Sequence, residues 1–454
     1  MSDKIKQNRG LIAFFCYSVV FILLSSLFIQ GHFDRLTIQN FRPQASTEKM
    51  PDILQSFQEF NIGTKKDIKG DDPGFMFLYI LASHLEGNKT VSTSTEAKFY
   101  TRTYHVFQIL IHLSFIALLL LVPSGLLNFS VKLSLLCFLI SPNLLAVFWG
   151  FDVYLFPLYA SIVSLFCLGN LRAKTLSRSK FLLVSVLLVI CEVFRKNSLL
   201  VFLPVLLLFT CKKDVQKKDK AVFLTTFILS VIMMKFLVSL AFHNPGHTVW
   251  HSLHAGLFEI GGCVDKKGES YPFVFYDVDS LKKDEMLYCS NKWNDAFEYV
   301  VAESHGIHDF FSHDYEELLK KQTIAIVSDH PVEALSFVTT RFMNILSFLP
   351  FKTHTRLGSV EEFKLVNVFE SIFFLVLSIL WFRKETDWEK KLVLSSMLFL
   401  SMVPPLLVHS GHLIYNMGPN FIQWVILGLA VEKIIALSAR KDQLKDKGEI
   451  SFIP

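Results

Sequence analysis

Charged residues are scarce in this 454-residue chain, where Asp, Glu, Lys and Arg make up 19% and hydrophobic residues 52%, with 45 Phe. Ordinary soluble domains do not have this composition. The chain has only 20 Gly, 15 Pro and 7 Cys, which excludes a collagen-like repeat and a small disulfide scaffold, and its apolar content excludes disorder. The composition therefore indicates a polytopic membrane protein with one sizeable water-facing insert.

Ten apolar runs are candidate transmembrane helices, and they predict an all-α polytopic membrane protein. The first run follows basic residues, as in a signal peptide, but no small-residue cleavage site comes after it, so we interpret it as a retained helix. The two runs beside Arg195 are short, so each is tilted, shielded or matched by a thinner bilayer, or the two form a broken hairpin. The runs are Leu11 to Gln30, Val106 to Val122, Leu133 to Trp149, Val153 to Gly169, Phe181 to Phe194, Ser198 to Cys211, Ala221 to Phe242, Leu365 to Phe382, Leu392 to Val408 and Pro419 to Leu437.

The basic residues predict the orientation of these helices. If the N-terminus is cytoplasmic, every short basic cluster between or after the runs falls inside, as the positive-inside rule requires. The clusters begin at Arg172, Lys212, Arg383 and Arg440. Both termini are then cytoplasmic, and because the net charge of +5 comes mostly from these clusters, it does not indicate nucleic-acid binding.

This orientation divides the chain into three regions. An N-terminal transmembrane region, 1–242, carries an external loop, 31–103; an external region, 243–364, contains an amphipathic helix near 332–348; and 365–454 holds the C-terminal transmembrane helices and a cytoplasmic tail. Five of the seven cysteines lie in or beside the apolar runs. Cys263 and Cys289 lie in the external region, where they could form a disulfide in an oxidising compartment or stay reduced.

An acidic pair precedes a short apolar segment in the first external loop. Asp71 and Asp72 are followed by Pro73 and by the stretch Phe75 to Ala82, which is too short to span a membrane. Asp72 as N-cap and Pro73 at the first helical position predict an interfacial or re-entrant helix. Two interpretations stay open: Asp72 caps the helix and Asp71 is solvated, or one carboxylate deprotonates a hydroxyl as a general base.

The second external region ends in a predicted amphipathic helix after His330 and Pro331, with Arg341 among its polar residues. It is either a plain packing helix or one wall of a lipid-facing cleft. Its apolar stripe consists of Val332, Leu335, Val338, Phe342, Ile345 and Leu349.

Four histidines recur at helical spacing at the start of the same region: His243, His247, His251 and His254, around Trp250. They could bind a divalent metal, contact an anionic substrate, or be ordinary interfacial residues. No carboxylate or Cys completes a recognised metal signature, so no metal ligand is assigned, and a divalent metal stays one of the open interpretations without being a predicted cofactor. His247, Trp250 and His251 are candidates for substrate contact.

Charged residues within apolar runs are costly and therefore suggest function. Glu192 and Arg195 either neutralise each other, or Arg195 with Lys196 faces the external side and binds a phosphate. Asp152, between the third and fourth runs, is a second acidic candidate.

This layout resembles the polytopic glycosyltransferases of the GT-C fold, which include protein O-mannosyltransferases and bacterial aminoarabinose transferases. The similarity rests on the acidic motif from Asp71 to Phe75 and on the segment His330 to Phe348. It implies transfer of a sugar from a polyprenyl-phosphate donor to a glycan, lipid or protein acceptor on the periplasmic or lumenal face, most simply at a bacterial inner membrane. The catalytic base would be Asp71 or Asp72, and the departing lipid phosphate would be bound by Arg195, Lys196 and Arg341.

Two alternatives use the same residues differently. A secondary transporter or flippase of an anionic or lipid-linked substrate would need the intramembrane charges, but the sequence does not show the paired, interrupted repeats that are typical of transporters. A noncatalytic scaffold for envelope or glycan assembly would tolerate loss of both aspartates.

Overall fold

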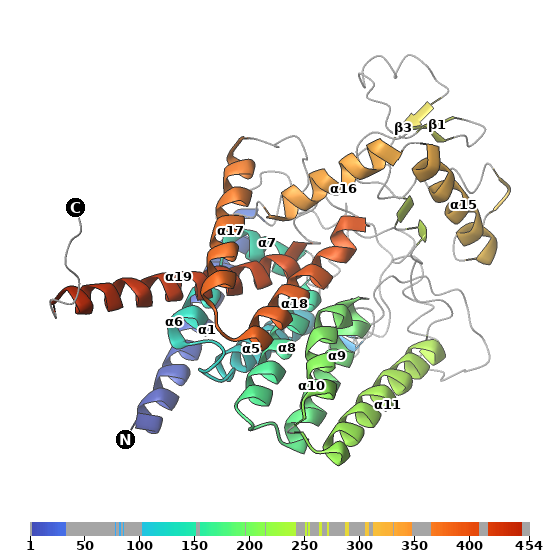
Figure 1. Ribbon diagram of the computed structural model, residues 1–454. Coiled ribbons are helices and arrows are strands. Elements are labelled where there is room, and N and C mark those ends of the chain that lie inside the picture. Colours follow the sequence, from blue (N-terminus) through green and yellow to red (C-terminus); the bar gives the residue numbers. More distant parts are fainter. Residues whose placement is uncertain are drawn as a thin grey trace, which may run out of the picture.

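The computed structural model describes residues 2–32, 78, 81–82, 85, 102–150, 155–195, 197–213, 215–241, 250–251, 253–254, 263–265, 270–271, 287–289, 305–307, 312–329, 331–346, 365–407 and 416–446. These residues are mostly helical, which agrees with the helical part of the predicted class (Figure 1). Each of the ten apolar runs is mostly helical over its described residues; the helix of Val106 to Val122 ends at Leu120, and the run Leu133 to Trp149 is interrupted.

Within the described residues, the bundle contains eleven α-helices and one short 3-10 helix, and two further α-helices lie outside it. The bundle elements are α1 (Ser2–His32), α5 (Arg102–Leu120), α6 (Phe129–Leu139), α7 (Pro142–Gly150), α8 (Phe156–Arg172), α9 (Arg178–Phe194), η3 (Ser198–Phe202), α10 (Leu203–Cys211), α11 (Lys217–Ala241), α17 (Leu365–Lys384), α18 (Trp388–Leu407) and α19 (Met417–Asp446). The outer helices are α15 (His313–Asp329) and α16 (Pro331–Leu346).

The third apolar run is two helices because local signals interrupt it. The side chain of Asn128 accepts a hydrogen bond from the backbone N–H of Val131 at 2.9 Å and so caps the start of α6. Pro142 begins α7, and a proline at the first helical position has no N–H to continue the previous helix. The chain therefore breaks at Ile140 and Ser141.

Helix α8 lies at the centre of the bundle. Nearly every side chain from Phe156 to Leu171 is buried, and all its apolar ones belong to the main hydrophobic core. Small residues permit close approach of its neighbours: a Cβ on Gly169 would lie 2.7 Å from Pro123 Cδ, and one on Gly418 of α19 would lie 3.2 Å from Pro157 Cβ. A helix that is buried on all sides has a nearly continuous apolar sequence, and Val153 to Gly169 is such an apolar run.

Lysines close several of the helical hairpins. Within the described part of the chain, Lys132, Lys220 and Lys391 each lie near the start of one helix and donate to a carbonyl near the end of the preceding helix. The acceptors are Leu120 at 2.7 Å, Thr210 at 2.7 Å and Phe382 at 3.1 Å, respectively. The last carbonyls of a helix lack intrahelical partners and carry partial negative charge, so an ammonium group is a favourable donor there.

Three described helical segments are long and apolar enough to cross a membrane: Asn8–Leu27, Thr103–Leu120 and Met417–Ala439. Phe129–Leu139, Phe156–Arg172 and Ser198–Cys211 are shorter apolar helices. The protein is thus expected to associate with a lipid bilayer. The number of ten spans and their orientation stay predictions.

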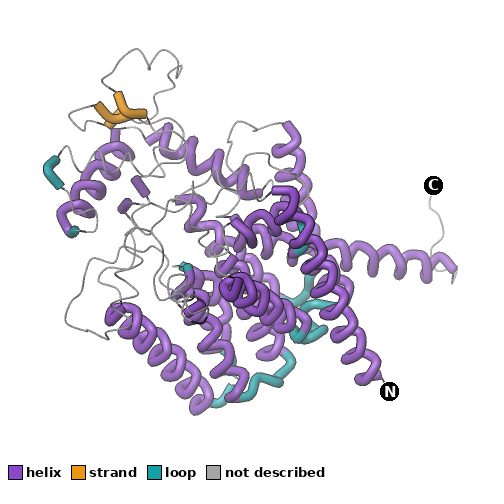
Figure 2. Tube along the Cα trace, turned by 180° about the vertical axis from the view of Figure 1, so that it is seen from behind, coloured by secondary structure: helices purple, strands orange, loops and turns teal. Residues whose placement is uncertain are grey.

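Helices α15 and α16 and a small sheet lie together above the bundle in Figure 1, and the view from behind in Figure 2 shows the same arrangement. The sheet contains β1 (Cys263–Asp265), β2 (Ser270–Tyr271) and β3 (Leu287–Cys289), all antiparallel, in the order β2-β1-β3. The sequence predicted an all-α protein, and this part of the prediction is wrong, because the described residues include a small sheet. Strands of two or three residues are too short to show an alternating pattern.

Candidate functional site

The turn between α9 and η3 is held by a carboxylate. Arg195 has extended backbone and ends α9, and Asn197 adopts the left-handed conformation with φ of 73°. Glu192 Oε1 accepts a hydrogen bond from the Asn197 N–H at 3.3 Å, and its Oε2 accepts one from the Leu199 N–H at 3.1 Å. Glu192 therefore satisfies backbone donors at the start of η3, a role that sequence analysis did not assign to it.

The backbone of Arg195 is fixed by the next helix. Its carbonyl accepts hydrogen bonds from the hydroxyl of Ser198 at 2.7 Å and from the Ser198 N–H at 3.3 Å. The residue is half-buried. The structure places Arg195 at the break between α9 and η3, with both neighbouring helices anchored.

Helix α16 exposes most of the predicted apolar stripe. Val332 is 74% exposed and Leu335 66%, and Val338 and Phe342 are also exposed. The last turn is different, because Ile345 and Leu346 are buried against Phe374, Met402 and partly buried neighbours. The predicted amphipathic helix is confirmed as a helix, and its exposed apolar part is the kind of surface that lies in a bilayer interface.

A polar contact attaches the end of α16 to the bundle. The amide of Gln423, on α19, donates a hydrogen bond to the carbonyl of Ile345 at 3.0 Å. This bond satisfies one of the last carbonyls of α16 in an apolar environment. Helix α16 is therefore held at its C-terminal end, while its first turns extend from the bundle.

Residues 250–254 pack against α15. Trp250, His251, Leu253 and His254 are helical, which is the conformation that the interpretation of the histidine spacing assumed. His251 is buried and its Nδ1 is hydrogen bonded to the hydroxyl of Tyr315 at 2.6 Å; Tyr315 is fully buried beside Leu319. This places His251 and half-buried Trp250 in the packing between two helices.

His254 is fully buried on the same face of this segment. Burial lowers the pKa of His254 from 6.5 to about 3, although a hydrogen bond with the Gln322 side chain acts in the opposite direction. The imidazole is therefore neutral at physiological pH.

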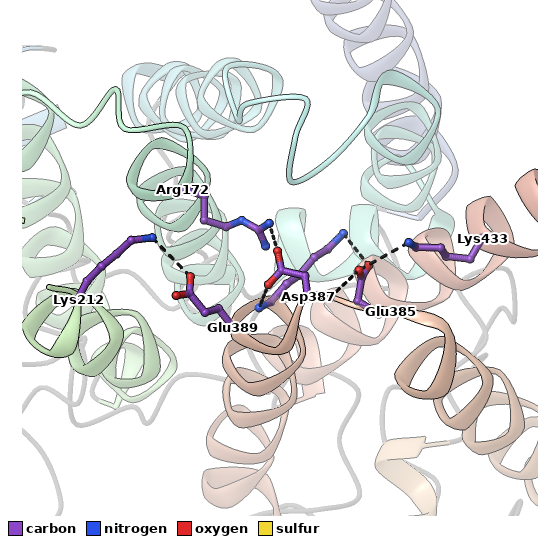
Figure 3. A network of polar contacts seen from close by, with 7 residues as sticks. Arg172, Lys212, Glu385, Asp387, Glu389 and Lys433 are labelled. Atoms are coloured by element: carbon purple, nitrogen blue, oxygen red, sulfur yellow. Dashed lines mark hydrogen bonds and ion pairs between the residues drawn. The ribbon is translucent and has the colours of Figure 1, made fainter. Parts of the chain in front are cut away.

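The end of the bundle opposite to α16 and the Arg195 turn carries a network of ion pairs (Figure 3). Glu385 is 3.4 Å from the ammonium group of Lys390 and 3.6 Å from that of Lys433 on α19. Arg172, at the end of α8, pairs with Asp387, whose Oδ1 also accepts a bond from the backbone N–H of Lys390 at 3.0 Å and so caps α18. The network joins the ends of α8 and α17 and the start of α18 to the middle of α19.

Lys212, just after α10, extends this network to that helix through Glu389 at 3.4 Å. Helix α10 thus ends at the network, whereas the turn at Arg195 begins η3 at the other end. Met402, which packs against α16, is 15 residues beyond Asp387 on α18, about 22 Å at 1.5 Å per residue. The Arg195 turn and α16 are therefore remote from the network, as the predicted topology requires.

Five of the predicted site residues lie outside the described residues: Asp71, Asp72, Asp152, Lys196 and His247. Arg341 lies on α16, but its side chain is also outside what the structure describes. Of the helix predicted after Asp72, the described residues Leu78, Leu81, Ala82 and Leu85 are all helical. Leu78 packs against the main core and Ala82 is buried, so this segment is docked on the bundle.

A buried polar chain crosses the core and was missed by sequence analysis. His112 on α5 is fully buried; its Nε2 is hydrogen bonded to the Tyr17 hydroxyl at 2.7 Å and its Nδ1 to the Tyr159 hydroxyl at 2.9 Å. These contacts join α1, α5 and α8. The available signal was a histidine inside an apolar run, where a polar side chain requires partners.

Among the described residues, no group of three or more His, Cys, Asp or Glu side chains is arranged to hold a metal ion. No family model, curated protein or solved structure matches this chain.

Proposed function

We propose that this chain is a membrane glycosyltransferase that moves a sugar from a polyprenyl-phosphate donor to an acceptor on the external face of the membrane. The observation that carries the proposal is α16, because an anchored helix with exposed Val332, Leu335 and Phe342 suits a site that must accommodate a lipid tail. The helical residues Leu78 and Ala82 support it, since they follow the acidic pair, Leu78 packs against the main core and Ala82 is buried.

The proposed reaction uses the two ends of the donor separately. The polyprenyl tail lies in the bilayer along the apolar side chains of α16, and the sugar and phosphate lie at head-group level. Asp71 or Asp72 removes the proton of the acceptor hydroxyl, whose oxygen attacks the anomeric carbon. The bond from that carbon to the phosphate oxygen breaks, so a single direct attack inverts the anomeric centre.

The departing polyprenyl phosphate requires cations. Arg195, Lys196 and Arg341 are the proposed ligands, since guanidinium and ammonium groups make charge-assisted hydrogen bonds to phosphate oxygens. Arg195 is suited to this task because its backbone is fixed at the α9–η3 turn. In a bacterial inner membrane with both termini cytoplasmic, the site would face the periplasm.

The proposal is tested with cells that lack the gene and are complemented with wild type, with the Asp71→Asn, Asp72→Asn double variant, or with Asp329→Asn. Asp329 is exposed at the end of α15 and provides a matched carboxylate-to-amide control. With equal amounts of protein in the membrane, mass spectrometry of envelope lipids and glycans should show the sugar restored by wild type and control only, with donor lipid accumulating in the double variant. Full restoration by the double variant would exclude an essential role for the two carboxylates.

A transporter or flippase is the second candidate, and one observation favours it. The break between α6 and α7 at Ile140 and Ser141 interrupts an apolar run, and interrupted helices are typical of transporter binding sites. In that case cells that lack the gene would retain the substrate on the cytoplasmic side. The Asp71→Asn, Asp72→Asn double variant would restore its transport if transport does not use the two carboxylates.

A further inference from the structure

Cys263 and Cys289 lie directly opposite each other in the small sheet. The central strand β1 pairs with β3 in the register Cys263↔Cys289, Val264↔Tyr288 and Asp265↔Leu287. Opposed Cα atoms in an antiparallel pair are about 4.5 or 5.5 Å apart, depending on whether the pair is hydrogen bonded. Both separations lie within the range of about 4.4–6.8 Å that a disulfide allows.

We propose that Cys263 and Cys289 form a disulfide that crosslinks β1 to β3. The other five cysteines are free thiols in the apolar helices α1, α6, α8, α9 and α10, so the chain separates its two cysteines of the external region from the rest. The link also has a physical use. Strands of three, two and three residues form too few hydrogen bonds to be stable alone, and a covalent bond holds their register.

The bond forms by thiol–disulfide exchange with a disulfide-bearing oxidant. One cysteine thiolate attacks the oxidant's disulfide, which breaks, giving a mixed disulfide and one oxidant thiol. The second cysteine thiolate then attacks the protein sulfur of that mixed disulfide and releases the second oxidant thiol. Two thiol protons and two electrons pass to the oxidant, which leaves as a dithiol.

The disulfide has a consequence for topology. Such bonds persist in the periplasm, the lumen of the endoplasmic reticulum or the cell exterior, and the cytosol keeps thiols reduced. A disulfide between β1 and β3 therefore places the sheet on the external side of the membrane. The bond is independent of the proposed transferase activity, because neither cysteine is among the residues assigned to it.

The test is peptide mapping of the full chain from membranes. Free thiols are blocked with N-ethylmaleimide in denaturant without reduction, and the protein is digested with trypsin. Cys263 is the only cysteine of the tryptic peptide 236–266, and Cys289 is the only one of 284–292. We expect these two peptides to be joined, lighter than their sum by two hydrogen atoms, and to separate on reduction. Cys16, Cys137 and Cys211, the exposed free thiols, should carry maleimide.

Single variants make the result independent of peptide recovery. In Cys263→Ser, Cys289 should become a maleimide-reactive thiol, and in Cys289→Ser the same should hold for Cys263. Finding both cysteines blocked by maleimide in the wild-type protein would overturn the disulfide. A bond from either cysteine to a third one would overturn it as well.

Discussion

The two ends of the helical bundle use their polar groups differently. Where α8 and α10 finish, Arg172, Lys212 and their acidic partners pair with one another and close the ends of four helices. At the opposite end, Glu192 and Gln423 bond to backbone groups, and α16 presents apolar side chains that the bundle does not cover. At the first end the charged side chains pair with one another, and at the second end α16 exposes an apolar surface suited to lipid.

This difference shows that the basic clusters have a second role. They predict orientation by the positive-inside rule, and in the fold the same kind of residue terminates helices, as Lys220 and Lys391 do. A charged side chain that is already paired within the protein contributes to stability and is less able to bind a ligand. The search for a substrate site therefore belongs at the end with α16 and Arg195.

The largest expected effect is on the paired end. In Glu385→Gln the ammonium group of Lys390, which is 9% exposed, loses its carboxylate, and we expect unfolding in detergent micelles to become easier by about 3 kcal/mol. Glu389→Gln is the matched control: its carboxylate is 30% exposed and should be worth about 1 kcal/mol or less. Equal effects of the two changes would contradict the idea that burial makes Glu385 the centre of the network.

The same carboxylate predicts a pH dependence. Burial raises the pKa of Glu385, but the Asp387 N–H and the ammonium groups of Lys390 and Lys433 together lower that pKa below its ordinary value. A lowered carboxylate pKa means that its stabilising contribution is complete at neutral pH and is lost as the pH falls through the folded-state pKa. The destabilisation by Glu385→Gln should therefore shrink in acid.

The second expected effect lies in the core between the two ends. His112→Leu leaves the hydroxyls of Tyr17 and Tyr159 without the imidazole, and burial of unsatisfied polar groups should cost about 2 kcal/mol. Ser114→Ala, on the exposed side of the same helix, should change the unfolding free energy by no more than about 0.5 kcal/mol. The free energy of unfolding, measured for both variants, tests this. Equal values for His112→Leu and Ser114→Ala would show that the hydrogen bonds of His112 do not stabilise the bundle.

A third effect concerns the outer helices. Because the pKa of His254 is lowered in the folded state, the unfolded chain binds more protons below about pH 6.5, and packing of α15 should weaken by up to about 1.4 kcal/mol per pH unit toward about pH 3. Amide hydrogen exchange of α15, corrected for its intrinsic pH dependence, measures this. His254→Leu should abolish the dependence, and equal protection of wild-type α15 at pH 7 and about pH 4 would refute it.

The smallest effect on stability, and the sharpest test of the unpaired end, is on α16. Leu335→Gln should change the free energy of unfolding by about 0.5 kcal/mol or less, because the side chain packs little, but it should lower sugar transfer. Ser336→Gln, also exposed, should affect neither quantity. A loss of more than about 1 kcal/mol in Leu335→Gln would make α16 a plain packing helix.

Hydropathy predicted the helices well and their interruptions poorly. Runs such as Val106 to Val122 became helices with ends shifted by a few residues, because apolar length is summed over many positions. Hydropathy did not predict the break at Ser141, because one break hardly changes the summed apolar length. Asn128 and Pro142 nevertheless carry ordinary signals for the start of a helix. For the candidate site, the sequence located Arg195 at a helix end and α16 as a helix, and it missed the backbone role of Glu192.

Local sequence alone established where apolar helices form, because hydropathy and capping act within a few turns of chain. It also placed the basic clusters at helix ends. Packing alone established which distant residues meet: Arg172 with Asp387, His251 with Tyr315 and Cys263 with Cys289. Such partners are separated by tens to hundreds of residues, and their pairing follows from helix crossings and strand register, which no local pattern encodes.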